Sequence, residues 1–169
     1  MTSYTLIPRS GWSPTPISTQ KMALLKSPVD VVFFAYTRKN YAKYGGKDSP
    51  GPEPNHEETV AELKYIARGD MIKVPDTRYN FLLGNDGCVY EGRGWKYRPF
   101  IPVKYVSLKY YRSIYITFLG DFSEVPPPDS MFKMRDDFLL DSVRKGNLRK
   151  KFVIITFATP WNTSHSLRH

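Results

Sequence analysis

Residues 79–95, with the sequence YNFLLGNDGCVYEGRGW, form the stretch that decides the fold. Two runs rich in apolar, β-branched and aromatic residues, 79–84 and Cys88–Glu91, predict two short β-strands. The residues between them read NDG, and this composition is typical of a tight hairpin turn because Asn, Asp and Gly tolerate positive φ. The stretch therefore predicts a β-hairpin.

Three further segments have the composition of strands. The run Val29–Tyr36 is β-branched and aromatic and shows no polar alternation after Asp30, which predicts a strand buried on both faces. Residues 114–119 and 152–157 predict two more strands.

Two segments have the spacing of helices. Residues 56–68 combine an apolar stripe with acidic side chains in the first turn, and Gly69 follows as a C-cap. Residues 131–143 place methionine, phenylalanine and leucine on one face, and Gly146 ends this second helix.

The order of these elements predicts the fold class. Strand, helix, hairpin, strand, helix and strand in succession favour an α/β protein with a central mixed sheet flanked by helices. We expect a single domain over residues 1–157, entered through an extended segment at 1–28, and a polar tail at 158–169. No apolar run reaches the length of roughly 18 residues that a membrane span needs, so the domain itself is not expected to cross a membrane.

Composition limits the chemistry available. The 169 residues carry a formal net charge of +9, which favours anionic partners, and the densest basic cluster is 144–151. Motifs that read nucleic-acid grooves are absent, so no nucleic-acid partner is predicted. The chain has three histidines, and Cys88 is its one cysteine, which excludes an internal disulfide and leaves few ligands for a metal.

Three stretches together resemble peptidoglycan recognition proteins. Residues 7–12 (IPRSGW) are similar to the family's RSxW, residues 79–95 to its YNFLxGxDGxVYEGRGW, and residues 113–122 (SIYITFLGDF) to its SIGIxFxGxF. The resemblance extends over 7–157 and implies a mixed sheet flanked by helices, with a groove for a muropeptide and a C-terminal helix that is lost or degenerate here.

The resemblance also implies a catalytic site, because active members are zinc amidases that hold the metal with two histidines and a cysteine. Ala35 stands at the position of the first histidine and Ile101 at the position we align with the second. No segment after residue 157 matches the cysteine motif, and Cys88 belongs to the hairpin instead. We therefore expect no metal, no cofactor and no amidase activity.

The same comparison gives candidate ligand-binding residues, should the groove remain open. They are Thr37, Arg68, Tyr79, Arg93, Trp95 and Lys96. Tyr79 matches the tyrosine that assists the metal in active members, although a packed strand residue is the simpler interpretation. Tyr115 replaces a glycine and residues 99–101 (PFI) replace Gly-Ala-His, which predicts a narrowed or closed groove.

Two hypotheses for function follow. The first is a non-catalytic regulator, a decoy or co-receptor similar to the insect LF-type ectodomain, that contacts other peptidoglycan recognition receptor domains. The alternative is a receptor domain that binds peptidoglycan fragments without cleaving them. Both imply an extracellular or cell-surface domain, derived from a membrane-anchored protein, and residues 162–164 (NTS) form a glycosylation sequon.

Overall fold

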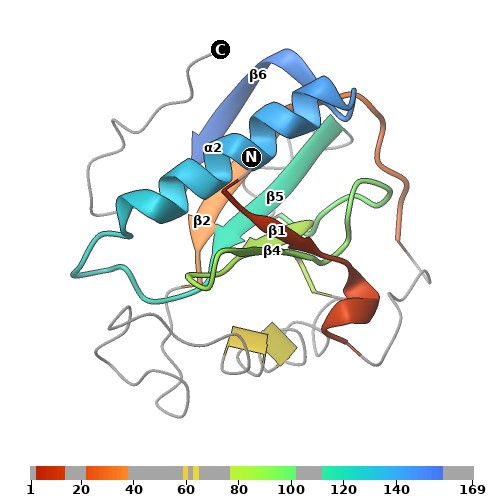
Figure 1. The fold of residues 1–169 in the computed structure, drawn as a ribbon. Helices are drawn as coiled ribbons and strands as arrows, with labels where there is room; N and C mark the ends of the chain where they lie inside the picture. Colours follow the sequence, from red (N-terminus) through yellow and green to blue (C-terminus); the bar gives the residue numbers. More distant parts are fainter. Residues whose placement is uncertain are drawn as a thin grey trace.

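The computed structural model describes residues 3–13, 22–37, 59–60, 63–64, 77–101 and 112–157. Within these residues one mixed sheet of six strands, in the order β1-β4-β3-β5-β2-β6, carries a long helix on one face (Figure 1). The elements are β1 (Thr5–Ile7), the 3-10 helix η1 (Arg9–Gly11), β2 (Val29–Tyr36), β3 (Phe81–Leu83), β4 (Cys88–Glu91), β5 (Ser113–Phe118), α2 (Asp129–Arg144) and β6 (Leu148–Thr156). This arrangement confirms the predicted α/β class with a mixed sheet.

The predicted hairpin is present. Strands β3 and β4 pair antiparallel, with Leu82 opposite Tyr90, and Gly87 in the turn has a φ of 80°. Positive φ is accessible to glycine at little cost, which explains the residue at this place. Strand β1 pairs in parallel with the outer side of β4, and we did not predict it, because three residues at a sheet edge give no periodic signal.

Strand β2 lies in the middle of the parallel part of the sheet, between β5 and β6. Every residue of β2 except Asp30 is buried, which confirms the prediction of a strand buried on both faces. From Val31 onward, its even-numbered side chains, such as Phe34, join the core beneath α2, whereas the odd-numbered ones, such as Phe33 and Ala35, join a second core on the opposite face. Adjacent side chains of a strand point to opposite faces, so β2 divides the two cores.

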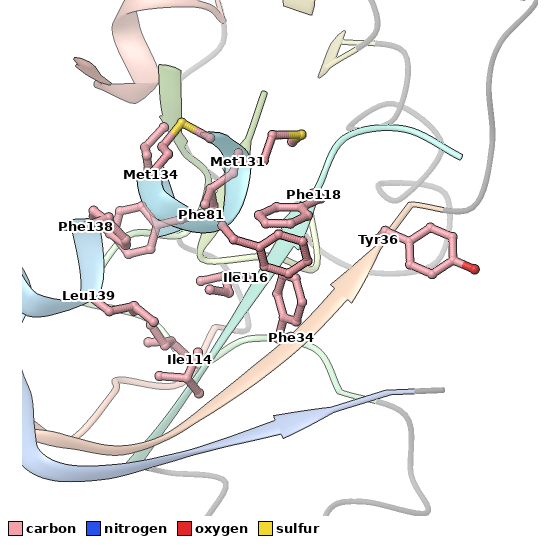
Figure 2. Packing of buried hydrophobic residues seen from close by; sticks show 14 of the residues in the cluster. Phe34, Tyr36, Phe81, Ile114, Ile116, Phe118, Met131, Met134, Phe138 and Leu139 are labelled. Atoms are coloured by element: carbon pink, nitrogen blue, oxygen red, sulfur yellow. The ribbon is translucent and has the colours of Figure 1, made fainter. Parts of the chain in front are cut away.

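Helix α2 covers one face of the sheet with the apolar side that its sequence predicts. Met131, Met134, Phe138 and Leu139 are buried there against strand residues, as Figure 2 shows. The helix begins at Asp129, two residues before the predicted start, and its first turn holds an acidic residue that suits the positive end of the helix dipole.

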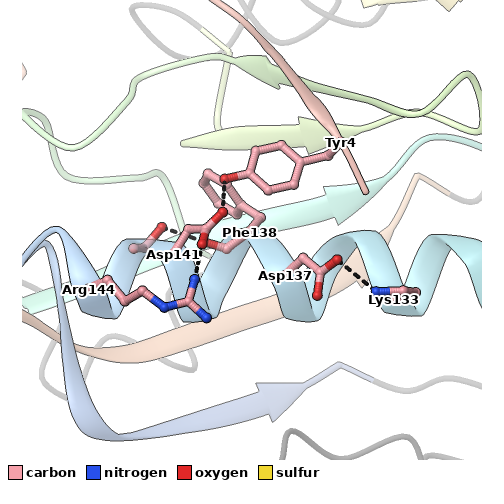
Figure 3. Close-up of polar contacts among 7 residues, drawn as sticks. Tyr4, Lys133, Asp137, Phe138, Asp141 and Arg144 are labelled. Atoms are coloured by element: carbon pink, nitrogen blue, oxygen red, sulfur yellow. Dashed lines mark hydrogen bonds and ion pairs between the residues drawn. The ribbon is translucent and has the colours of Figure 1, made fainter. Parts of the chain in front are cut away.

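The N-terminal segment contacts helix α2 through Tyr4, whose ring packs edge-on against Phe138. The Tyr4 hydroxyl donates to Asp141 Oδ2 at 2.8 Å, and Arg144 forms an ion pair with the same carboxylate (Figure 3). Lys133 and Asp137 pair one turn apart at 3.0 Å. Burial is the larger cause and the Asp141 carboxylate the second of a raised pKa at the Tyr4 hydroxyl, so the phenol remains a proton donor.

Strand β6 is longer than its sequence predicts. It begins at Leu148, four residues before the predicted start. The prediction missed this start because the charged residues 149–151 do not have the composition of a buried strand. Of the predicted helix at 56–68, Thr59, Val60, Leu63 and Lys64 are helical, and the other residues lie outside the described part, as does the tail at 158–169. Among the described helices, none has the length and apolar character that crossing a membrane requires.

Candidate functional site

The face of the sheet opposite α2 carries the position where the resemblance places a zinc ligand. Ala35 lies on this face near the end of β2 and is 7% exposed. Phe157, the residue after β6, lies beside it, since the Phe157 amide donates to the Phe34 carbonyl oxygen at 2.9 Å. Thr117 of β5 is the parallel partner of Ala35 on the other side. We proposed no role for Phe157 from the sequence, although it ends the last predicted strand segment.

Four aromatic side chains lie in or against the same hydrophobic core as Ala35, and we call them the aromatic cluster: Phe33, Tyr79, Tyr115 and Phe157. The ring centroids of Tyr79 and Tyr115 are 4.6 Å apart, and those of Tyr115 and Phe157 are 5.4 Å apart. Phe33 and Phe157 stack at 5.5 Å. Offset and edge-to-face contacts at these distances stabilise ring pairs beyond the area that they bury.

Ile101 belongs to the same hydrophobic core and is 2% exposed. Across the described ranges, no three side chains of His, Cys, Asp or Glu come together in a group that could hold a metal. Cys88 is buried in the hairpin. Desolvation is the main cause that raises the pKa of its thiol, and the neighbouring Asp86 carboxylate raises it further. A thiol held in its protonated form is a poor ligand and a poor nucleophile.

Arg93 is directed into the protein. Its Nε donates to the Thr77 carbonyl oxygen at 2.6 Å and its Nη1 to the Arg98 carbonyl oxygen at 2.8 Å, and the residue is 6% exposed. The preceding Gly92 allows the chain to pass close by, because a Cβ there would collide with the Tyr79 carbonyl oxygen. The guanidinium therefore holds the loop after β4 in shape.

Asn80 organises the same loop, and we did not identify it from the sequence. Its Nδ2 donates to the carbonyl oxygens of Gly94 and Tyr97 at 2.8 and 2.9 Å. Its Oδ1 accepts from the Tyr115 amide at 2.7 Å. One fully buried side chain thus joins the loop to strand β5, which carries a ring of the aromatic cluster.

The remaining candidate residues are not gathered at one place. Trp95 packs on the α2 side, with its ring centroid 5.2 Å from Phe81 and 6.2 Å from Phe138, so the structure does not bring it together with Tyr79. Lys96 is exposed, with its ammonium 5.6 Å from the Tyr97 ring. Arg68 lies outside the described residues. The ligand-binding role of this set stays a prediction.

Thr37 lies just beyond the end of β2 and makes two side-chain hydrogen bonds with one residue. Its hydroxyl donates to the Gly120 carbonyl oxygen at 3.2 Å and accepts from the Gly120 amide at 2.9 Å. This reciprocal pair ties the end of β2 to the segment after β5, so a structural role accounts for the hydroxyl without a ligand.

Replacing Thr37 with valine tests that role. The change keeps the branched shape and leaves the Gly120 amide and carbonyl without the hydroxyl, which we expect to cost about 1–2 kcal/mol of stability. The free energy of unfolding from urea titrations is the measurement. Thr37→Ser retains the hydroxyl and should lose less than half as much, whereas a loss in the serine variant that exceeds the loss in the valine variant would indicate that packing of the methyl group rather than hydrogen bonding is responsible.

Relatives of the chain are found both by sequence and by structure. No family model matches the chain. A peptidoglycan-recognition protein of Drosophila melanogaster is 30% identical over 151 residues, covering 89% of this chain and 74% of the relative. Peptidoglycan recognition protein 1 of Rattus norvegicus is 29% identical over 155 residues, covering 88% and 74%.

Solved structures agree with these relatives. Bumblebee PGRP-SA superposes with a TM-score of 0.74 at 27% identity, covering 90% of this chain and 83% of that one. PGRP-LE, solved in complex with tracheal cytotoxin, superposes with a TM-score of 0.72 at 26% identity, covering 89% and 81%. Similarity in sequence and in fold over most of each molecule leads to one conclusion: the chain belongs to the peptidoglycan recognition protein family.

Proposed function

We propose that this domain is a non-catalytic member of its family that regulates peptidoglycan sensing through contact with other recognition receptor domains. The observation that carries the proposal is that Ala35 shares its hydrophobic core with the aromatic cluster. In this proposal the position that serves hydrolysis in active members serves packing here.

The chemistry of zinc hydrolysis supports the proposal by what it requires. A catalytic zinc needs three protein ligands and an open position for a water molecule, whose pKa the metal lowers. An alanine methyl has no lone pair, and the neighbouring Phe157 ring has no donor atom of the kind that zinc binds. Ile101 is equally apolar. Tyr79 retains its phenol, but in the absence of metal-bound water it has no partner in catalysis.

Binding of a muropeptide is expected to be weak for related reasons. Sugar hydroxyls and stem-peptide carboxylates must exchange water for polar partners when they bind. The aromatic cluster offers mainly ring surface, and Tyr115 is only 6% exposed. Arg93, the cation retained at a family position, already donates to two backbone carbonyl oxygens of its own chain. Releasing it for a carboxylate would leave those carbonyls without these donors.

A receptor domain that binds peptidoglycan fragments without cleaving them is the second candidate. Its support is the fold shared with PGRP-LE, whose solved structure holds tracheal cytotoxin, a monomeric diaminopimelic acid-type peptidoglycan. Among the candidate ligand-binding residues that the structure describes, Lys96 is the exposed one, and its ammonium could meet a carboxylate from solvent. Either candidate places the domain outside the cell or at its surface.

Metal analysis and ligand titration test the proposal together. The purified domain is loaded with excess zinc, dialysed and measured by elemental mass spectrometry, with a zinc amidase of the family treated identically as the control. We expect well below about 0.1 mol of zinc per mol, since a site without ligands has no affinity. Stoichiometric zinc that survives dialysis would contradict the proposal.

Calorimetric titration with tracheal cytotoxin then separates the two candidates. We expect no saturable heat at ligand concentrations up to about 100 μM, which corresponds to binding weaker than roughly −5.5 kcal/mol. Saturable micromolar binding would support the receptor domain instead. In either case, co-precipitation with a separately expressed recognition ectodomain tests the proposed protein contact.

A further inference from the structure

The turn between α2 and β6 and the start of β6 carry the densest positive charge in the chain. Five of the eight residues 144–151 are basic and all five are exposed. We call these five residues the basic bulge: Arg144, Lys145, Arg149, Lys150 and Lys151. Strand β6 is the outermost strand at one edge of the sheet, so no further strand pairs with its outer side (Figure 1).

The backbone at this place departs from regular pairing. Val29 pairs with Leu148, and the next pair is Val31 with Val153. Between these pairs β2 contributes one residue, Asp30, whereas β6 contributes the four residues 149–152. The extra residues interrupt the regular pairing of the edge strand, and bulges bend a strand locally and re-aim the side chains that they carry. Three consecutive cations are displayed by this bend.

The charges of the bulge are only partly neutralised. Arg149 Nε lies 2.5 Å from Asp30 Oδ1, and Arg144 pairs with Asp141. In the part of the chain that the structure describes, no acidic side chain forms an ion pair with Lys145, Lys150 or Lys151. Their three ammonium groups therefore face solvent with their charge uncompensated.

Two more cations stand at the same end of the sheet. Strands β2, β5 and β6 run parallel, so the residues that precede these strands lie at the same end of the sheet. Lys26 is exposed shortly before β2, and Arg112 immediately precedes β5 with its Nη1 donating to the Pro28 carbonyl oxygen at 3.3 Å. The zinc-ligand position at Ala35 belongs to the other end of these strands, so the basic bulge is a separate surface.

Edge protection explains part of this pattern. Lysines and bulges on an outer strand discourage pairing with another chain. That role is satisfied by the charges on β6 itself and does not require Arg144 and Lys145, which belong to the end of α2 and the turn. The continuation of positive charge across two elements points to a ligand of several negative charges.

We propose that the basic bulge binds a sulfated glycosaminoglycan chain. A linear polyanion can follow an edge strand, and closely spaced lysines and arginines bind such chains by releasing their counterions. Residues 144–151 contain no aromatic side chain on which a base could stack, which disfavours single-stranded nucleic acid. The choice of glycan rests on the extracellular location in the proposed function, but not on the absence of zinc or of muropeptide binding.

The test compares two double neutralisations of equal charge. Lys150→Gln/Lys151→Gln removes two cations from the bulge, and Lys64→Gln/Lys133→Gln removes two exposed cations elsewhere. Lys133 lies twelve residues before Lys145 on the chain, roughly 18 Å along a helix. Each protein, the parent domain and a Lys150→Arg/Lys151→Arg variant are titrated with a heparin-derived octasaccharide over about 0.05–0.2 M salt.

We expect the bulge neutralisation to weaken octasaccharide binding about tenfold at low salt. It should also reduce the slope of log affinity against log salt by about two. The affinities of the control and of the arginine variant should stay within about twofold of the parent. Equal losses in both neutralised proteins would overturn the proposal, because they would show a response to net charge alone. Equal affinity for a DNA duplex or a polyphosphate of matched charge would overturn the assignment to a sulfated glycan. Zinc content and tracheal cytotoxin binding, measured separately, show whether the proposed function fails independently.

Discussion

Replacing Asn80 with alanine should lower the free energy of unfolding by roughly 3–5 kcal/mol, a large share of the stability of a domain of this size. The Asn80 side chain is fully buried and makes three hydrogen bonds to backbone groups. Truncation leaves two carbonyl oxygens and the Tyr115 amide without these partners, in a place that water reaches poorly, and adds a small cavity. Chemical denaturation, monitored by circular dichroism, measures this loss in the free energy of unfolding.

Two further variants separate the causes. Asn80→Asp keeps the size of the side chain but turns its two donors into an acceptor that faces the carbonyl oxygens of Gly94 and Tyr97. We expect it to be as unstable as the alanine variant at neutral pH, so recovery by Asp would contradict the hydrogen-bond argument. The control is Asn147→Ala, which changes a half-buried asparagine in the turn after α2. This substitution should lower the free energy of unfolding by less than about 1 kcal/mol.

Loss of shape in the loop should accompany the loss of stability. Because Asn80 holds the carbonyls of Gly94 and Tyr97, the loop that carries Arg93 and Lys96 depends on it. Amide hydrogen exchange in the Asn80→Ala variant is therefore expected to rise first over residues 92–98, and later over α2.

The parts of the fold that were predictable from the sequence have local signals. The hairpin has a turn sequence that demands positive φ, and β2 has an uninterrupted run of β-branched and aromatic residues. Helix α2 repeats its apolar residues with helical spacing. In each of these the residues that decide the structure are neighbours in sequence, so periodicity and turn chemistry were sufficient.

The parts that escaped prediction depend on contacts between distant segments. Strand β1 is defined by its pairing with β4, more than eighty residues away, and the start of β6 is a charged bulge that does not alternate. Asn80 looks like one more polar residue near a strand until the loop and Tyr115 surround it. Trp95 matched the family motif, but its location on the α2 side follows from which face of the sheet the loop returns to, and no local pattern encodes that choice.

Replacing Tyr115 with alanine is the most informative change at the candidate site. Tyr115 lies on β5, between β3 and β2, and its ring contacts those of Tyr79 and Phe157. The residue is 6% exposed, so removing the ring empties a space within the aromatic cluster. We expect a loss of roughly 3–5 kcal/mol in the free energy of unfolding, as for other buried aromatic residues.

The same variant tests whether the aromatic cluster is what limits ligand binding. With the Tyr115 ring absent, the surface beside Ala35 becomes accessible, and tracheal cytotoxin should bind measurably where the parent domain shows no saturable heat. Tyr115→Phe keeps the ring and should resemble the parent in binding, with a stability change below about 1.5 kcal/mol. Titrations at about 10 °C, near the temperature of maximal stability, with the fold checked by near-ultraviolet circular dichroism, keep the comparison valid for a weakened domain. A folded Tyr115→Ala variant that still fails to bind would show that the missing polar partners, rather than the aromatic ring, account for the weak recognition.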